Sequence, residues 1–151
     1  MDQTTTEQRP YNLRTAVPSD FSFCRKLYIE TIFPLLEALD CLDRQRAEKA
    51  FKSYFKCHEI SLVVIDDDVV GWFQVSEETE QINLDQVYLI SAYRNRGLGT
   101  LLIRDVMQKA ASKGKPLHLS MIKGNPAITL YQRLGFAFCG EDDIKFHMLW
   151  E

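Results

Sequence analysis

The stretch Tyr93–Thr100 reads YRNRGLGT, and it decides the fold because it joins a strand pattern to a helical one. Before it, QINLDQVYLI has the alternation of a strand. After it, apolar residues recur at helical spacing until Ser112-Lys113-Gly114. A strand that ends in a glycine-bearing turn and opens a helix presents unpaired NH groups at the positive end of the helix dipole. The stretch therefore predicts an anion site.

The glycines and arginines of this loop suit a phosphate group. Gly97 and Gly99 lack a Cβ atom, so the backbone can approach a phosphate closely. Arg94 and Arg96 add positive charge beside it. The alternative is a plain turn that is capped by glycine and flanked by solvated arginines.

Two common nucleotide-binding motifs do not fit. A dinucleotide-binding GxGxxG loop needs a small residue where Leu102 stands and an acidic residue ~20 positions later, where the chain reads LHLSM. A Walker A loop needs a lysine after its last glycine, and Thr100 follows Gly99 directly. We therefore expect backbone NH groups to hold a pyrophosphate in a loop of another kind.

The rest of the chain predicts alternating strands and helices. We expect residues 1–10 to form a flexible tail and residues 11–151 a single domain. The first helix should end near Pro34 or soon after it, because proline lacks the NH that a helix needs. The order is β-α-α-β-β-β-α-β-α-β-β. The expected strands are 11–17, 60–65, 69–75, 81–90, 117–121, 136–140 and 144–150, and the expected helices start near 18, 43, 97 and 126.

Composition narrows the class of protein. A formal net charge of −3 disfavours a protein that binds nucleic acid mainly by neutralising phosphates. The start MDQTTTEQRP is not a signal peptide, and no run of ~18 apolar residues suggests a membrane span, so we expect a soluble cytoplasmic protein.

The potential metal ligands do not form a recognisable site. The four cysteines are scattered and are expected to be reduced and mostly packed, and the three histidines show no partner. Asp66-Asp67-Asp68 separates two strand patterns and is read as a hairpin turn rather than as a metal site. No metal is expected.

Two motifs together resemble the GCN5-related N-acetyltransferase superfamily. Arg94-x-x-Gly97-x-Gly99 is similar to its loop that binds the coenzyme A pyrophosphate, and KGNPAITLYQRLGF, residues 123–136, is similar to its next motif. The resemblance implies an α/β (α+β) fold with a mixed, mostly antiparallel central sheet of about six to seven strands flanked by helices. It also implies an acetyl-CoA-dependent N-acetyltransferase.

The resemblance implies where coenzyme A binds. The strand before the loop would be bulged and would splay from the next strand, with the pantetheine arm between them. The implied contacts are Leu89, Ile90, Arg94, Asn95, Arg96, Gly97, Leu98, Gly99, Thr100, Asn125 and Tyr131. Asn125 precedes Pro126, so it is also a plausible helix cap.

Acetyl transfer to an amine needs an acid and a base. An amine with a pKa of ~10.4 is neutral in only about one molecule in 10³ at pH 7, so a base must remove a proton. The resemblance places Tyr131 as the acid for the leaving thiolate; the alternative is a tyrosine that only packs. Asp85 shares a face with Gln81 and Asn83 and is the candidate base.

The acceptor pocket is expected from residues 21–42 and the last hairpin. Tyr28, Glu30 and Phe33 are its candidate residues, and Glu30 and Glu37 compete with Asp85 as the base. The acceptor would be a small-molecule amine or a protein amino group, and homodimers are common in the superfamily. The alternative function is a non-catalytic acyl-CoA-binding regulatory module, while a nucleic-acid binder through Arg94, Arg96 and Arg104 fits the net charge poorly.

Overall fold

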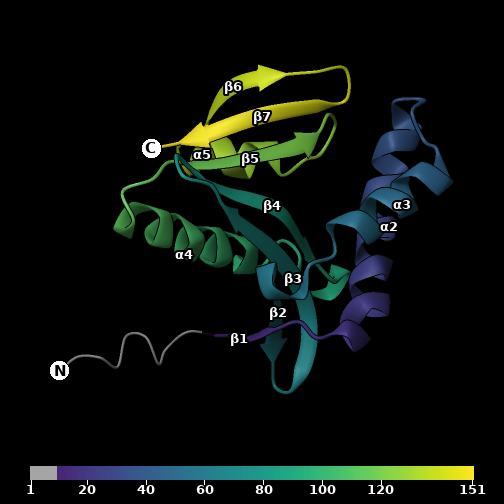
Figure 1. Ribbon diagram of the computed structural model, residues 1–151, viewed down its shortest axis with the longest axis horizontal. Helices are drawn as coiled ribbons and strands as arrows, with labels where there is room; N and C mark the ends of the chain where they lie inside the picture. Colours follow the sequence, from purple (N-terminus) through teal and green to yellow (C-terminus); the bar gives the residue numbers. More distant parts are fainter. Residues whose placement is uncertain (1–9) are drawn as a thin grey trace.

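A computed structural model of the protein describes residues 10–151, so the tail expected over residues 1–10 lies almost wholly outside the described residues (Figure 1). The seven strands form one sheet in the order β1-β2-β3-β4-β5-β7-β6. The strands are β1 (Asn12–Thr15), β2 (Ile60–Ile65), β3 (Asp68–Glu77), β4 (Ile82–Leu89), β5 (Leu117–Ile122), β6 (Ala137–Glu141) and β7 (Lys145–Trp150). The helices are α2 (Phe21–Ala38), α3 (Arg44–Tyr54), α4 (Leu98–Ser112) and α5 (Ile128–Arg133), with short 3-10 turns at 18–20, 57–59 and 91–93.

This order and topology confirm the predicted fold class. Every neighbouring pair of strands is antiparallel except β4 and β5, which are parallel because α4 returns the chain across the sheet. Asp66 and Asp67 join β2 to β3 with φ of 51° and 68°. These positive φ angles at both central residues are those of a type I′ hairpin turn, as the three aspartates predicted.

The first helix passes its proline. α2 continues from Pro34 to Ala38, and Asp40 follows with a φ of 56°. A proline removes one backbone hydrogen bond within a helix but does not prevent a further turn when the apolar face stays packed. Phe33, just before the proline, is buried.

The helices cover the two faces of the sheet separately (Figure 1). One core lies under α4 and α5 and includes Leu102, Val106, Leu117 and Met148. The other lies between β2–β4 and the pair α2 and α3. Trp72, fully buried there, donates its indole NH to the carbonyl of Cys24 at 3.2 Å. The sheet therefore separates two hydrophobic cores, one on each of its faces.

The centre of the sheet opens between β4 and β5. Only Ile82, Asn83 and Leu84 pair with β5, although β4 runs on to Leu89. The pairing of β3 with β4 shifts register so that Gln74 lies opposite Gln86 and Val75 opposite Leu84, which leaves Asp85 as the extra residue of a β-bulge. The bulge and the splay that the resemblance implied are both present.

The structure can be compared with the sequence expectations on membrane spans, metal ligands and cysteines. Among the helices of residues 10–151, none is long and apolar enough to cross a membrane. The described residues hold no group of three or more His, Cys, Asp or Glu that could bind a metal ion. All four cysteines are free, but the expectation that most are packed is wrong: Cys24 is buried and Cys57 half-buried, whereas Cys41 and Cys139 are exposed because they lie in a turn and on an edge strand.

Candidate active site

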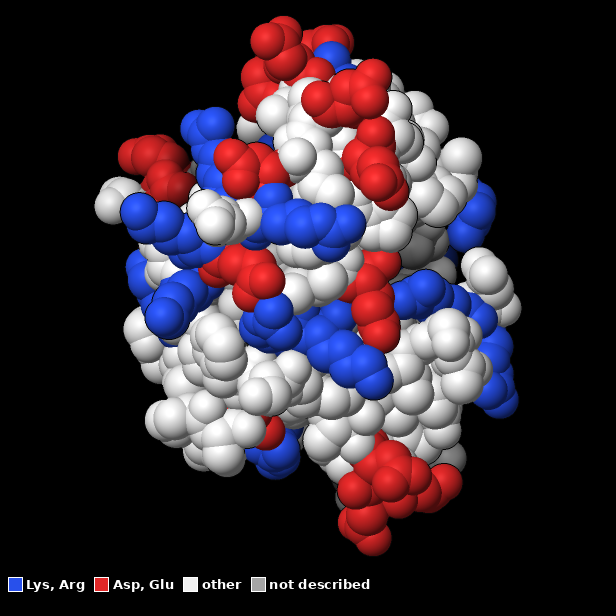
Figure 2. Space-filling view, turned by 90° about the vertical axis from the view of Figure 1, so that its right-hand side faces the viewer, with Lys and Arg blue, Asp and Glu red and all other residues white. Residues whose placement is uncertain are grey.

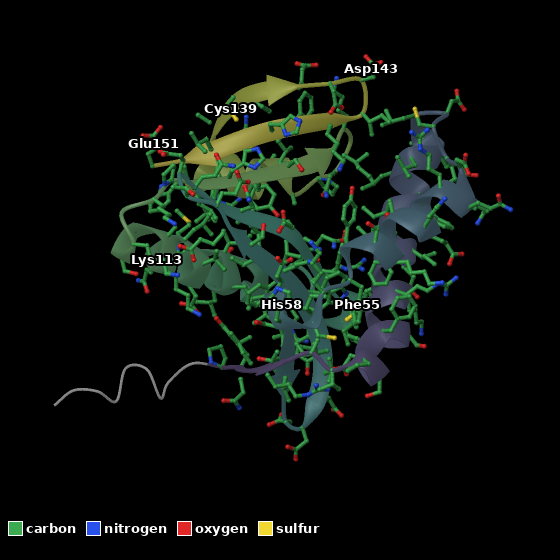
Figure 3. The ribbon with its side chains drawn as sticks, viewed as in Figure 1. Phe55, His58, Lys113, Cys139, Asp143 and Glu151 are labelled. Atoms are coloured by element: carbon green, nitrogen blue, oxygen red, sulfur yellow. The ribbon has the colours of Figure 1, made fainter. Side chains whose placement is uncertain are left out.

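A cavity of about 670 Å³ lies where β4 and β5 part, on the side of the sheet that α2 and α3 cover. Side chains from these elements point into the space between them (Figure 3). Its lining includes Tyr28, Glu59, Gln74, Ser76, Asp85, Gln86, Tyr88, Ser120, Asn125 and Tyr131. The cavity therefore joins the splayed strands to the N-terminal helices.

The glycine loop leads from β4 to α4 in the predicted way. Gly97 precedes the helix with a φ of 85°, and Asn95 also has a positive φ of 59°. A Cβ atom on Gly99 would come no closer than 4.0 Å to the side chains of Leu130 and Leu89, so the space beside Gly99 is open. The loop thus has the free surface and the helix start that an anion site needs. This cradle fits the pyrophosphate of coenzyme A.

Both arginines of the loop bind the loop itself. Arg94 donates from Nε to the carbonyl of Leu89 at 2.9 Å. Arg96 donates from Nη1 to the carbonyl of Ala92 at 2.8 Å and lies 5.2 Å from the ring centroid of Tyr93. Their direct bonds thus hold the turn that carries Gly97. The other loop residues, Leu98 and Thr100, lie in the first turn of α4, with Leu98 buried in the core.

Tyr131 lies on α5 at the other side of the splay. Its side chain is 6% exposed, lines the cavity and packs edge-to-face against Phe136 at 5.7 Å. Burial raises the pKa of Tyr131 to about 12, because desolvation disfavours the phenolate. Asn125 also lines the cavity, and its Oδ1 accepts from the NH of Ala127 at 2.9 Å, so it holds the turn that precedes α5.

Asp85 faces the cavity from the bulge. Its Oδ2 accepts from the hydroxyl of Ser76 at 2.6 Å. Desolvation raises the pKa of Asp85 above its usual value; the Ser76 hydrogen bond opposes this, and the negative charge of Glu59 adds to it. The side chain of Asp85 is exposed to solvent, but nearby protein atoms remove part of the hydration of its carboxylate. Gln81 and Asn83 are hydrogen-bonded to each other at 2.7 Å, and Asn83 reaches the same Ser76 at 3.3 Å.

Sequence reasoning missed a polar network beside Asp85. Gln74, 3% exposed, donates to Glu59 Oε1 at 2.9 Å and to the carbonyl of Tyr54 at 2.7 Å. Gln86 donates to Gln74 Oε1 at 2.8 Å and accepts from the hydroxyl of Tyr88 at 3.0 Å. The network holds the Glu59 carboxylate at the cavity. Its one sequence signal was a glutamine inside the apolar strand VVGWFQV.

Of the residues expected to line the acceptor pocket or supply its base from α2, only Tyr28 lines the cavity. Tyr28 lines the cavity, and its hydroxyl donates to the carbonyl of Ala47 at 3.1 Å. Phe33 is buried under the guanidinium of Arg44, 5.2 Å from the ring centroid, and does not line the cavity. Glu30 is exposed outside it, and Glu37 lines a separate hollow at the α2–α3 turn. Their helical spacing turns these three away from Tyr28.

Two histidines have partners that the sequence did not reveal. His118 and His147 stack with ring centroids 5.6 Å apart, because neighbouring strands β5 and β7 bring them together. His147 also lies 3.6 Å from Asp142. Burial, followed by the nearby charge of His147, lowers the pKa of His118.

Curated relatives match part of the chain. It is 33% identical over 85 residues to a streptothricin acetyltransferase from Streptomyces lavendulae, covering 54% of this chain and 45% of that protein. It is 31% identical over 103 residues to a spermine/spermidine N(1)-acetyltransferase from Bacillus subtilis, covering 60% of this chain and 68% of that protein. The chain thus spans about half the length of the first relative.

Solved structures match nearly all of the chain. The PaiA N-acetyltransferase from Thermoplasma acidophilum, in complex with coenzyme A, superposes with a TM-score of 0.74 at 14% identity over 93% of this chain and 98% of that one. A GNAT family acetyltransferase from Elizabethkingia anophelis with acetyl-CoA bound gives 0.64 at 16% identity, over 95% and 99%. These likenesses show the shared fold.

The sequence pattern of one family extends over both motifs and most of the cavity lining. The Acetyltransferase (GNAT) family matches residues 25–136, which include most of α2 and all of the bulged strand, the glycine loop and α5. This match confirms the resemblance seen in the sequence and places the chain in an acetyltransferase class. The chain belongs to the Acetyltransferase (GNAT) family.

Proposed function

We propose that the protein is an N-acetyltransferase that moves the acetyl group of acetyl-CoA to a primary amine by direct attack. The observation that carries this proposal is one cavity reached by Tyr131 from α5 and by the Asp85 and Glu59 carboxylates from the other side. Acetyl-CoA supplies an activated acetyl thioester; Gly97 and Gly99 offer backbone for its pyrophosphate. Asn125 would hold the turn beside the pantetheine path.

Tyr131 is proposed as the general acid. A phenol with a pKa of about 12 is protonated at neutral pH, so it can donate its proton toward the leaving sulfur. Its burial beside Phe136 fixes the ring and excludes water around the hydroxyl. The packing role and the acid role therefore belong to the same side chain.

Asp85 is proposed as the general base, with Glu59 as the alternative. Both carboxylates line the cavity, and each is held by one protein donor that leaves further lone pairs for an amine or a water. The raised pKa of Asp85 makes this carboxylate the stronger base of an otherwise weak type. Neither Glu30 nor Glu37 lines the cavity, which argues against them.

The test is acetyl-CoA-dependent acetylation of a panel of amines. Release of coenzyme A thiol with a matching gain of one acetyl group in the mass of the acceptor is the expected result. Coenzyme A binding without thiol release, across amino acids, diamines, aminoglycosides and peptides, would favour the non-catalytic module instead. A panel that covers both small molecules and peptide N-termini also separates the two acceptor types.

A further inference from the structure

Six charged side chains line the cavity, and the three acidic ones are already bound by the protein. Asp43 accepts from the NH of Arg46 at 3.1 Å, which caps α3. Glu59 accepts from Gln74 and Asp85 accepts from Ser76. Each of the three acids is therefore held in place by a neutral hydrogen-bond donor.

The three cations, Arg46, Lys56 and Lys145, are different. Within residues 10–151, their side-chain nitrogens make no hydrogen bond, ion pair or ring contact with another residue. Elsewhere Lys113 and Lys115 share Glu77, and Lys123 reaches Glu141, each at 2.7 Å. Lys145 is half-buried, and its side-chain nitrogen has no anionic partner among the described residues.

Arg46, at the start of α3, and Lys145, opposite the last residue of β5, both line the cavity, and Asp43 lies beside Arg46 at the start of the same helix. Lys145 pairs with Ile122 where β5 ends, two residues or about 7 Å past the position of Ser120. Arg46 lies eight residues, about 12 Å, along α3 from Tyr54, whose carbonyl holds Gln74. The Glu59 and Gln74 network thus lies at the other end of α3 from Arg46. Lys56 lies beside that network, since its carbonyl accepts from the NH of Glu59 at 2.9 Å.

The cavity lining contains apolar side chains besides its charged ones. These are Ile32 and Leu36 from α2, Ile122 from β5 and Ile144 from the turn before β7. The face that carries α2 and α3 shows Lys and Arg side chains across its middle, with acidic ones among them and gathered at its upper and lower ends (Figure 2). A ligand that suits this lining needs an anionic group, an apolar part and a group that a carboxylate can deprotonate.

We infer that the acceptor is a small amine that carries a carboxylate, of the amino-acid type, with Arg46 and Lys145 as its carboxylate site. This rests on the proposed acetyl transfer. A planar guanidinium bonds a carboxylate through two parallel N–H donors, and an ammonium adds a point charge. The volume of about 670 Å³ is in the range of about 300 to 1,000 Å³ typical of small-ligand sites.

The reaction balances on this assignment. The acceptor ammonium first gives one proton to a cavity carboxylate, which later releases it to solvent. The neutral nitrogen then forms a bond to the acetyl carbon as the carbon–sulfur bond breaks. The sulfur takes a proton from Tyr131, and the second proton lost by the nitrogen restores the Tyr131 hydroxyl. The amide product has lost its ammonium charge and keeps its carboxylate. Its attraction to the cavity carboxylates is thereby lost, which favours release.

Two matched acceptor pairs test the inference. Phenylalanine and phenethylamine differ by the carboxylate alone, and 6-aminohexanoate and 1,6-diaminohexane exchange a carboxylate for a second ammonium. We expect kcat/KM, followed by thiol release, to favour the carboxylate member by about tenfold or more, the effect of one charge-assisted hydrogen bond. Lys145→Met and Arg46→Gln should each reduce that preference, and Lys49→Met, which removes an exposed charge from α3 outside the cavity, should keep it.

The carboxylate site, its two residues and the acetyl transfer itself can each fail separately in these measurements. Equal or higher kcat/KM for the decarboxylated amine or the diamine overturns the carboxylate site while leaving acetyl transfer intact. Preserved preference in both Lys145→Met and Arg46→Gln overturns the assignment to these two residues. Absence of thiol release with every amine overturns the proposed function and this inference with it. Equal coenzyme A affinity among all variants, measured by calorimetry, shows that they remain folded.

Discussion

Burial decides the chemistry of single residues at this site. Tyr131 and Tyr88 are both buried tyrosines, and desolvation raises the pKa of each. They differ in their hydroxyl partners, since Tyr88 donates to Gln86 and is part of the network that holds Glu59. In the proposed mechanism, Tyr131 is the tyrosine whose proton passes to the leaving sulfur.

Replacing Tyr131 tests the acid at the residue scale. Tyr131→Phe keeps the ring that packs on Phe136 and removes only the hydroxyl. We expect kcat to fall by about 10² or more with little change in the affinity for acetyl-CoA, because the lost proton donor acts only in the transition state. Steady-state kinetics and calorimetry measure the two effects. Unchanged turnover would leave Tyr131 with its packing role alone.

Asp85 predicts a pH dependence with a defined sign. Because its pKa is raised in the folded protein, ionisation of Asp85 costs stability as pH rises through that pKa, and protonation below it removes the base. We expect kcat/KM to fall as pH falls through a pKa above the usual aspartate value of 3.8. Asp85→Asn should lower kcat/KM by about 10² or more and abolish this acid limb.

The matched variant is Glu59→Gln, which keeps a partner for Gln74 and removes the competing carboxylate. A smaller loss than in Asp85→Asn, with the acid limb intact, agrees with Asp85 as the base. If Glu59→Gln shows the larger loss and the missing limb, the base is Glu59. Both pH profiles are measured at saturating acetyl-CoA, so that the pH dependence of acetyl-CoA binding does not affect kcat/KM for the amine.

At the scale of elements, the connection from β4 to α4 is built for a close approach of backbone to ligand. The side chains of Arg94 and Arg96 bind the loop's own carbonyls, and the first turn of α4 carries its NH groups beside Gly99. Gly97 is needed for its φ of 85°, whereas Gly99 has ordinary helical geometry. Gly99 therefore matters for the space it leaves.

Gly99→Val tests that space without a large change in the fold. The free protein has room for the first added atom, since no other residue's side chain comes within 4.0 Å of it. We expect the Kd for coenzyme A to rise at least about tenfold, measured by calorimetry, because the isopropyl group occupies the pyrophosphate position. Gly140→Val on β6, where a Cβ also meets nothing within 4 Å, is the control. Equal affinity for both variants would remove the loop from cofactor binding.

At the scale of the whole molecule, two parts of the sheet meet at a narrow seam. Strands β1–β4 and strands β5–β7 are joined by three register pairs, Ile82 with Leu117 through Leu84 with Leu119. Lys113 and Lys115 add ion pairs to Glu77 across the same end. A ligand that bonds to both strands beyond the seam would stabilise the folded state.

Coenzyme A should therefore raise the melting temperature. At a free concentration of 100 times Kd, binding to the native state adds about 2.7 kcal/mol. For a protein of this size that corresponds to a rise in Tm of about 5 to 10 °C. Thermal unfolding with and without coenzyme A measures it, and Gly99→Val at the same concentration should show a smaller rise. An equal rise in that variant would contradict binding through the loop.

The sequence by itself determined the order of elements and the residues proposed for the cofactor end of the site. Strand alternation, helix spacing and the glycines of YRNRGLGT are local signals, and the paired motifs placed Tyr131 and the loop. Tertiary structure decided the proposed acceptor end. Glu59, Gln74, Arg46 and Lys145 come from four different elements, and only sheet pairing and the packing of α3 bring them around one cavity. The bulge at Asp85 depends on the register with β3, and the outward turn of Glu30 depends on how α2 packs, so neither could be derived from spacing along the chain.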